Sequence, residues 1–110
     1  MKKYFSVFFL FLVMPVFANS PIRVVTIKTL VIHDSNSQVY VTVEPAFTHN
    51  EGCQSNDVLV VLKSNPSFPQ IYSALLASYH VNGKITGWVN GCDSQSGVSS
   101  PILTRLDLVK

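Results

Sequence analysis

The apolar positions after residue 19 follow two periods, and together they predict five strands and one helix. The segment from Ile22 to His33 is rich in β-branched residues and is apolar on both alternating sets. A strand of this kind is central in a sheet, or it bends so that its two halves face the core differently. The pattern puts one set on each face of the strand: Val25, Ile27 and Val31 on one side, and Val24, Leu30 and Ile32 on the other.

The next segment completes a predicted hairpin. Residues 34–37 are all turn formers. Residues 38–44 then alternate strictly, which predicts a strand with Val39, Val41 and Val43 inward and Tyr40 outward. A polar loop follows over 45–56, and residues 57–63 form a short apolar run that is typical of a buried strand.

A single helix is predicted between Ser67 and Asn82. Ser67 and Gln70 have the spacing of a capping box, and Pro69 suits a first helical turn. Apolar residues then recur at steps of three and four, which indicates one buried face made of Phe68, Ile71, Tyr72, Leu75, Leu76 and Tyr79. Asn82 and Gly83 are typical of a helix end.

Two further strands are predicted after the helix. In the first, residues 84–90, Ile85, Gly87 and Val89 fall on one side, and Trp88, the only tryptophan, falls on the other. A polar loop over 91–97 leads to the last strand, residues 101–109. There the pattern assigns one face to Ile102, Thr104, Leu106 and Leu108.

The order of elements is therefore β-β-β-α-β-β, and it predicts one domain over residues 19–110. This is the order of the OB-fold, a five-stranded partly open barrel. A long first strand that is apolar on both faces fits a strand shared by both halves of such a barrel, and closure hides the sheet edges. We predict a mainly β, OB-fold-like barrel with one helix. The alternative is an open α+β sheet with the helix on one face.

The first eighteen residues have the three parts of a secretory signal peptide. Lys2 and Lys3 give a positive start, an apolar run follows, and Ala18 precedes an expected cut at Asn19. The apolar run is shorter than the roughly 20 residues of a spanning helix. We expect an exported protein, periplasmic or secreted, with no stable membrane insertion after cleavage. The alternative is an uncleaved N-terminal anchor.

Charge and cysteine content narrow the class of protein further. Lys2 and Lys3 account for the whole formal charge of +2, so the mature chain has six basic and six acidic residues. A neutral chain lacks the basic stripe that nucleic-acid binding requires, and we exclude that partner. The two cysteines, Cys53 and Cys92, predict one disulfide in an exported protein, which stabilises the fold by about 4 kcal/mol. A zinc site is the weaker alternative, because no histidine gives ligand spacing beside them.

A family resemblance rests on residues 68–88, FPQIYSALLASYHVNGKITGW, a helix that enters a Gly-Lys turn and then a strand. This run looks like the corresponding part of the B subunits of pertussis-like and subtilase-type toxins. The chain also resembles small secreted proteins of Gram-negative bacteria with one cysteine pair and a Gly-Cys pattern like Gly52-Cys53 and Gly91-Cys92. It departs from the toxin subunits in having no further cysteines, and their sugar-binding residues do not match it position by position. The resemblance implies an OB-fold protein that forms rings of five and binds cell-surface glycans.

No arrangement of residues predicts catalysis. The serines lack a Gly-x-Ser-x-Gly elbow. His33 and Asp34 are adjacent at a hairpin end, and His80 suits the dipole of a helix end. We therefore expect no enzyme, no cofactor and no metal site. A small hydrolase with a site that the pattern does not reveal is the third functional hypothesis.

The candidate ligand-binding residues are Trp88, Tyr40, His49 and Glu51. Both aromatic residues lie opposite the aliphatic face of their strand, where aromatic rings stack on sugars or anchor interfaces. The alternative for Trp88 is packing under a loop or against a neighbouring subunit. His49 and Glu51 lie in the loop before Cys53, near the usual ligand side of the barrel.

The first functional hypothesis is a non-enzymatic exported binding or assembly module, whose most specific form is a homo-oligomeric carbohydrate-binding subunit. The second is a periplasmic inhibitor or immunity-type protein that binds a partner protein.

Overall fold

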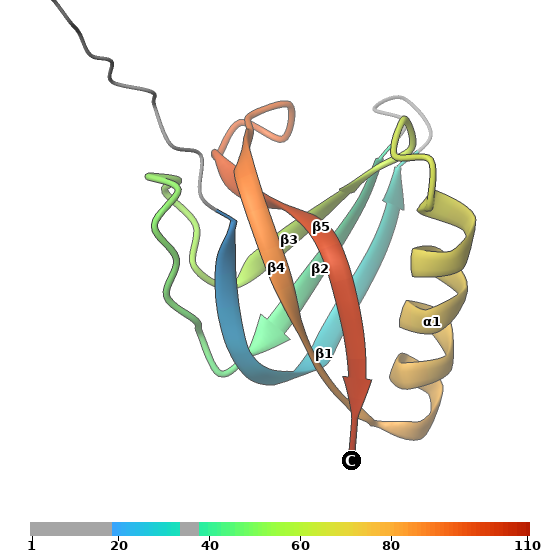
Figure 1. Cartoon of the computed structure of the whole chain (residues 1–110). Coiled ribbons are helices and arrows are strands. Elements are labelled where there is room, and N and C mark those ends of the chain that lie inside the picture. Colours follow the sequence, from blue (N-terminus) through green and yellow to red (C-terminus); the bar gives the residue numbers. More distant parts are fainter. Residues whose placement is uncertain (1–18, 34–37) are drawn as a thin grey trace, which may run out of the picture.

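The computed structural model describes residues 19–33 and 38–110, which form five strands and one helix (Figure 1). The predicted signal peptide, residues 1–18, and the predicted turn over 34–37 lie outside the described residues. The mainly β class with a single helix is confirmed. The elements follow one another as β1 (Ser20–His33), β2 (Gln38–Glu44), β3 (Val58–Leu62), α1 (Phe68–Val81), β4 (Lys84–Asp93) and β5 (Ser100–Val109).

Every strand pairs with two neighbours, so the five-stranded sheet closes on itself in the order β1-β2-β3-β5-β4. Four of the five pairings are antiparallel. The fifth joins β3 to β5 in parallel and has a single register pair, Val60 with Ile102. In Figure 1, β1 starts at the upper left of the sheet, and the C-terminal end beyond β5 lies at the bottom.

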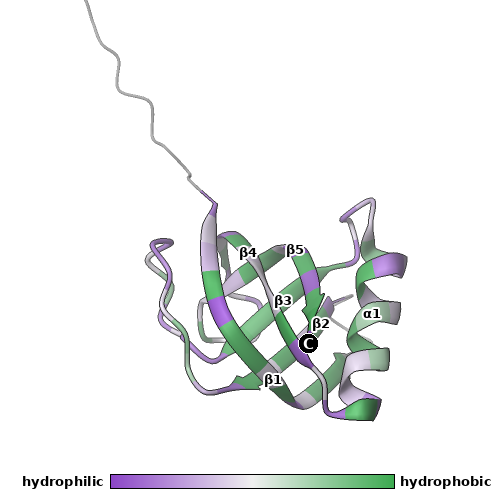
Figure 2. Cartoon of the chain, turned by 60° about the horizontal axis from the view of Figure 1, so that its bottom comes forward, coloured by the Kyte–Doolittle hydropathy of each residue, from purple (hydrophilic) through white to green (hydrophobic). Residues whose placement is uncertain are grey.

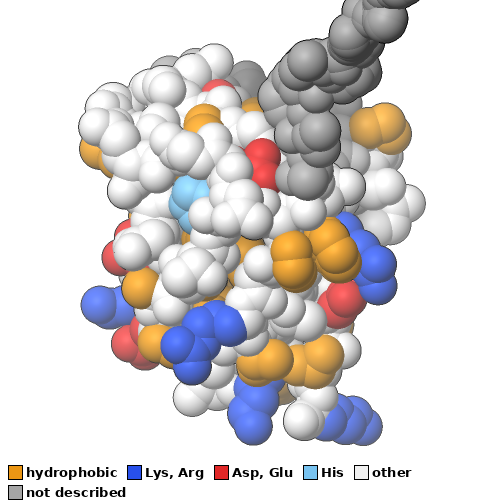
Figure 3. All heavy atoms as spheres, turned by 60° about the vertical axis from the view of Figure 1, so that its left-hand side comes forward, with side chains coloured by type: hydrophobic (Ala, Val, Ile, Leu, Met, Phe, Trp, Pro, Cys, Tyr) orange, Lys and Arg blue, Asp and Glu red, His pale blue; other side chains and the backbone are white. Residues whose placement is uncertain are grey.

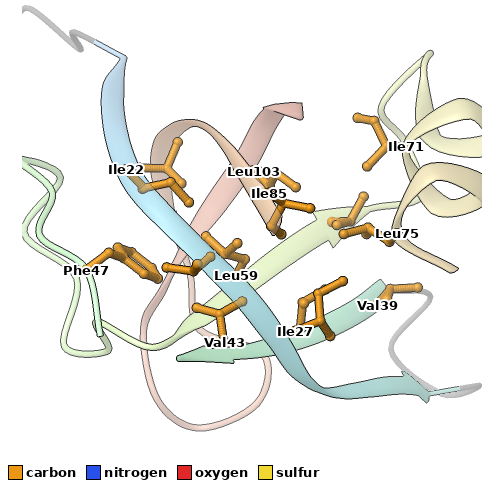
Figure 4. Close-up of a cluster of buried hydrophobic side chains, with 14 residues drawn as sticks. Ile22, Ile27, Val39, Val43, Phe47, Leu59, Ile71, Leu75, Ile85 and Leu103 are labelled. Atoms are coloured by element: carbon orange, nitrogen blue, oxygen red, sulfur yellow. The ribbon is translucent and has the colours of Figure 1, made fainter. Parts of the chain in front are cut away.

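Aliphatic side chains fill the space inside the closed sheet, as Figure 4 shows. The predicted inward valines of β2 are buried, and so are Ile85 and Val89 of β4, which confirms the alternation in both strands. Phe47, from the loop between β2 and β3, bounds this core on one side. Ile71 and Leu75 of α1 bound it on the other. In Figure 2 the strands are green over much of their length, and purple is common in the loops.

β1 faces the core in three short segments rather than along one alternating set. Its register shifts between Ile22 and Val25 and again between Ile27 and Thr29, as expected for β-bulges. Each bulge adds one residue and moves the following side chains to the other face. The residues that pack in the core are Ile22, Val25, Ile27 and Leu30. The prediction that placed Val31 with Val25, and Leu30 with Val24, was therefore wrong.

β5 contains the same kind of irregularity. Its pairing with β4 shifts between Trp88 and Val89, so that Trp88 pairs with Arg105 and Val89 pairs with Leu103. Leu103 is fully buried, although the pattern placed it away from the aliphatic face, and Leu108 at the strand end is 52% exposed. The predicted shared face of β5 was wrong, because one extra residue separates its two halves.

The helix has a narrower buried face than its apolar residues suggested. Ile71, Leu75 and Ser78 are buried, and Phe68 and Tyr72 pack against the core edge with their rings stacked at 5.7 Å. Leu76 and Tyr79 are exposed, so the prediction that both belong to the core was wrong. One helix resting on a closed sheet has contact along a single stripe, and these two residues lie beside it.

The two helix ends differ in how well the sequence described them. The helix ends at Val81 and is followed by the predicted stop at Asn82, which adopts the left-handed conformation. The Asn82 N–H donates to the Tyr79 carbonyl at 3.3 Å, and the Gly83 N–H donates to the Ser78 carbonyl at 2.8 Å. The predicted capping box is absent, since the Ser67 side chain caps no N–H group. Asn65 instead accepts hydrogen bonds at the start of the helix. Its side-chain oxygen accepts from the Ser67 N–H at 2.8 Å, and its backbone carbonyl accepts from the Phe68 N–H at 2.9 Å.

Candidate functional site

The loop between β2 and β3 is joined covalently to the end of β4. Cys53 and Cys92 form the predicted disulfide, with their Cα atoms 5.6 Å apart. Cys92 is exposed and Cys53 is partly buried. The bond holds the residues after Cys53 beside the residues after Cys92, and both segments line a hollow described below.

Glu51 ties the same loop to two strand ends. One carboxylate oxygen accepts from the Gly91 N–H at 2.8 Å, and the other accepts from the Ser20 hydroxyl. The Ser20 oxygen in turn accepts from the Asn50 N–H at 3.0 Å. Hydrogen bonds to an ionised acceptor are the stronger kind. Glu51 therefore fixes the start of β1 relative to the end of β4.

His49 is occupied inside the loop. Its Nδ1 accepts from the Glu51 N–H at 3.2 Å, which assigns the proton to Nε2, and Nε2 donates to the Ser55 carbonyl at 3.0 Å. The ring also packs against Phe47 with the centroids 5.9 Å apart. His49 and Glu51 thus shape the loop, and a direct contact of either with a ligand stays a prediction.

Trp88 stands at a hollow on the outer side of β4 and β5, with a volume of about 450 Å³. We name it the Trp88 hollow; its described lining residues are Asn19, Trp88, Asn90, Thr104 and Arg105. The bulge in β5 turns two consecutive residues outward beside the one indole. The Thr104 hydroxyl donates to the Trp88 carbonyl at 3.3 Å, and the Arg105 Nε pairs with Asp107 at 3.0 Å.

The indole is neither buried nor fully exposed, so the hollow offers part of an aromatic surface with polar groups around it. Glu51 supports this hollow indirectly. It accepts hydrogen bonds from Ser20 and Gly91, and these two residues directly follow the lining residues Asn19 and Asn90 in the chain.

A second and larger hollow, of about 800 Å³, lies on the outer face of β2 and β3. We name it the β2–β3 groove. Tyr40 is part of its lining but is only 8% exposed, which corrects the expectation of an exposed aromatic face. The Gln38 side-chain amide donates to the Tyr40 hydroxyl at 3.1 Å and to Asp93 at 2.9 Å. Loop residues from both sides of the disulfide cover this face of the sheet.

The structure therefore separates the predicted site residues. Trp88 and Tyr40 lie in two hollows that share no described lining residue, and His49 and Glu51 support the loop. Asn19, Asn90, Thr104 and Arg105 were not among the site residues predicted from the sequence. A β-bulge has no signal in a pattern of period two, and Asn19 approaches Trp88 only because β1 pairs with β4.

Within residues 19–33 and 38–110, no three His, Cys, Asp or Glu side chains gather closely enough to hold a metal ion. The same part of the chain has no helix with the length and apolarity needed to cross a membrane. Comparisons with known protein families, with curated proteins and with solved structures found no match.

Proposed function

We propose that the closed sheet is an OB-fold-like barrel and that the protein is an exported, non-enzymatic module that binds saccharides. The neighbour order of the strands and the place of α1 between β3 and β4 support the fold, because the OB-fold is a five-stranded barrel of this kind. The disulfide supports export, since disulfides persist in oxidising compartments. The Trp88 hollow supports the ligand class most directly.

One observation carries the proposal: a partly exposed indole is surrounded by hydrogen-bonding side chains. A sugar ring has an apolar C–H face and a rim of hydroxyls, so it needs a flat apolar platform with donors and acceptors around it. The indole is such a platform. The amides of Asn19 and Asn90 each both donate and accept, and Arg105 has N–H donors beyond the Nε that meets Asp107.

A glycan array compares the unmodified protein with Trp88→Ala. We expect binding to at least one glycan and a loss of about tenfold or more in affinity for the variant, equivalent to about 1.4 kcal/mol. Tyr79→Ala is the matched control, because Tyr79 is also an exposed aromatic residue but lies on α1, outside the hollow. It should bind as the unmodified protein does. An unmodified protein that binds no glycan, or a Trp88→Ala variant that binds fully, would refute the Trp88 hollow as a saccharide site.

Binding to a partner protein is the second candidate function, and a separate surface favours it. Val81 is 70% exposed and Leu108 is 52% exposed, and both lie at an apolar hollow between the end of α1 and the end of β5. Exposed apolar patches often mark protein interfaces. Native mass spectrometry tests whether further copies of the chain cover this surface: a ring supports the oligomeric subunit, and a monomer favours the inhibitor.

A further inference from the structure

The β2–β3 groove has a floor that belongs to the sheet and walls that belong to two loops. Residues of β1, β2 and β3 form the floor, residues 54–57 form one wall, and residues 95–98 form the other. Its described lining includes Val31, Asn56, Asp57, Gln95 and Val98.

The two walls are held together by several bonds. The Gln54 N–H donates to the Ser99 hydroxyl at 2.8 Å, and the Ser99 N–H donates back to the Gln54 side-chain oxygen at 3.0 Å. The Ser55 N–H donates to the Ser99 carbonyl at 2.9 Å. The disulfide joins the residue directly before the first wall, Cys53, to Cys92, three positions before the second wall. A groove fixed in this way loses little freedom when a ligand binds, which favours binding.

The charge of the lining limits the class of ligand. None of the described lining residues is Lys or Arg, and Asp57 is the one acidic side chain among them. A phosphate or carboxylate ligand would find no opposite charge there. On the face that Figure 3 shows, most of the basic side chains, in blue, lie in the lower half of the view.

The hydrogen-bonding groups limit the class further. Amide and hydroxyl side chains make up more than half of the described lining residues. A purely apolar ligand would displace water from these side chains and would not replace the hydrogen bonds that the water had made. Addition of a peptide strand needs a free main-chain edge. Here β2 pairs on both sides, and the Asp57 carbonyl already accepts from the Val43 N–H at 2.9 Å.

We infer that the β2–β3 groove is a second saccharide-binding site, specific for uncharged oligosaccharides and independent of the Trp88 hollow. The amides of Asn56 and Gln95 bond the sugar hydroxyls from opposite walls. Val31 and Val98, which are 39% and 49% exposed, contact the C–H faces of the rings. This goes beyond the proposed function, because it gives one chain two separate saccharide sites.

The test is an NMR titration of the full mature chain with uncharged hexasaccharides of glucose, mannose and N-acetylglucosamine. Hexagalacturonate serves as the charged comparison. At concentrations up to about 10 mM, where millimolar binding is detected, at least one uncharged probe should shift the amide signals of residues 54–58 and 95–98. Asn56→Ala/Gln95→Ala should weaken that binding by about tenfold or more. Trp88→Ala should leave it unchanged, and each variant is first compared with the unmodified protein by its amide spectrum.

Three outcomes would overturn the inference. The first is that no uncharged probe shifts the groove signals. The second is that hexagalacturonate binds the groove more strongly than the uncharged probes do. The third is that the groove shifts are lost in Trp88→Ala. The two proposals can fail separately. If no probe shifts the groove signals but the array shows glycan binding that is lost in Trp88→Ala, only the second site is refuted. A negative array with groove shifts that depend on Asn56 and Gln95 refutes only the ligand role of Trp88.

Discussion

Removal of the Cys53–Cys92 disulfide is a perturbation whose size follows from the structure. The bond joins residues 39 positions apart, and releasing a loop of this length adds conformational entropy to the unfolded chain worth about 4 kcal/mol at 25 °C. A domain of this size has a total stability of about 5–14 kcal/mol. Both cysteines keep contact with solvent, so serine in their place adds little desolvation cost. We therefore expect Cys53→Ser/Cys92→Ser to lose about 4 kcal/mol of unfolding free energy.

Urea unfolding followed by the fluorescence of Trp88, the only tryptophan, measures this loss. In thermal unfolding the same variant should melt about 15–30 °C lower, since 1 kcal/mol corresponds to about 4–8 °C in a domain of this size. Ser94→Ala, an exposed change in the neighbouring loop, is the control and should stay within about 0.5 kcal/mol. A loss below about 1 kcal/mol for the double variant would show that restraint of the unfolded chain is not what the disulfide contributes.

Two further changes test the packing around the candidate sites. Gly87→Ala should lose about 3 kcal/mol of unfolding free energy. The added Cβ would lie 2.1 Å from the Arg105 carbonyl oxygen, a backbone atom of the paired strand that cannot rotate out of the way as a side chain can. A variant that melts at the same temperature as the unmodified protein would contradict this. Glu51→Ala should lose about 2–3 kcal/mol in urea unfolding, since the Gly91 N–H and the Ser20 hydroxyl lose their acceptor. Glu51→Gln keeps an acceptor oxygen and should lose less; equal losses for both variants would refute the role of these hydrogen bonds.

The candidate site was predictable only in part. Trp88 was selected because it lies opposite the aliphatic side of its strand, and the structure places it at a hollow. Tyr40 was selected by the same rule but is buried, because residues 54–57 and 95–98, which follow the two cysteines, cover the face of the sheet on which Tyr40 lies. Alternation within one strand says which way a side chain points. It does not say which distant segment covers that side.

The order of the strands and the helix, the inward valines of β2 and the cysteine pairing were determined by the sequence alone. Backbone geometry imposes a period of two on a strand and of 3.6 on a helix, and two cysteines leave one intramolecular pair. The tertiary structure decided where β1 and β5 change face, which helix residues are exposed and which polar residues surround Trp88. Each of these depends on a bulge or on contacts between segments far apart in the chain, and a local period contains no record of either.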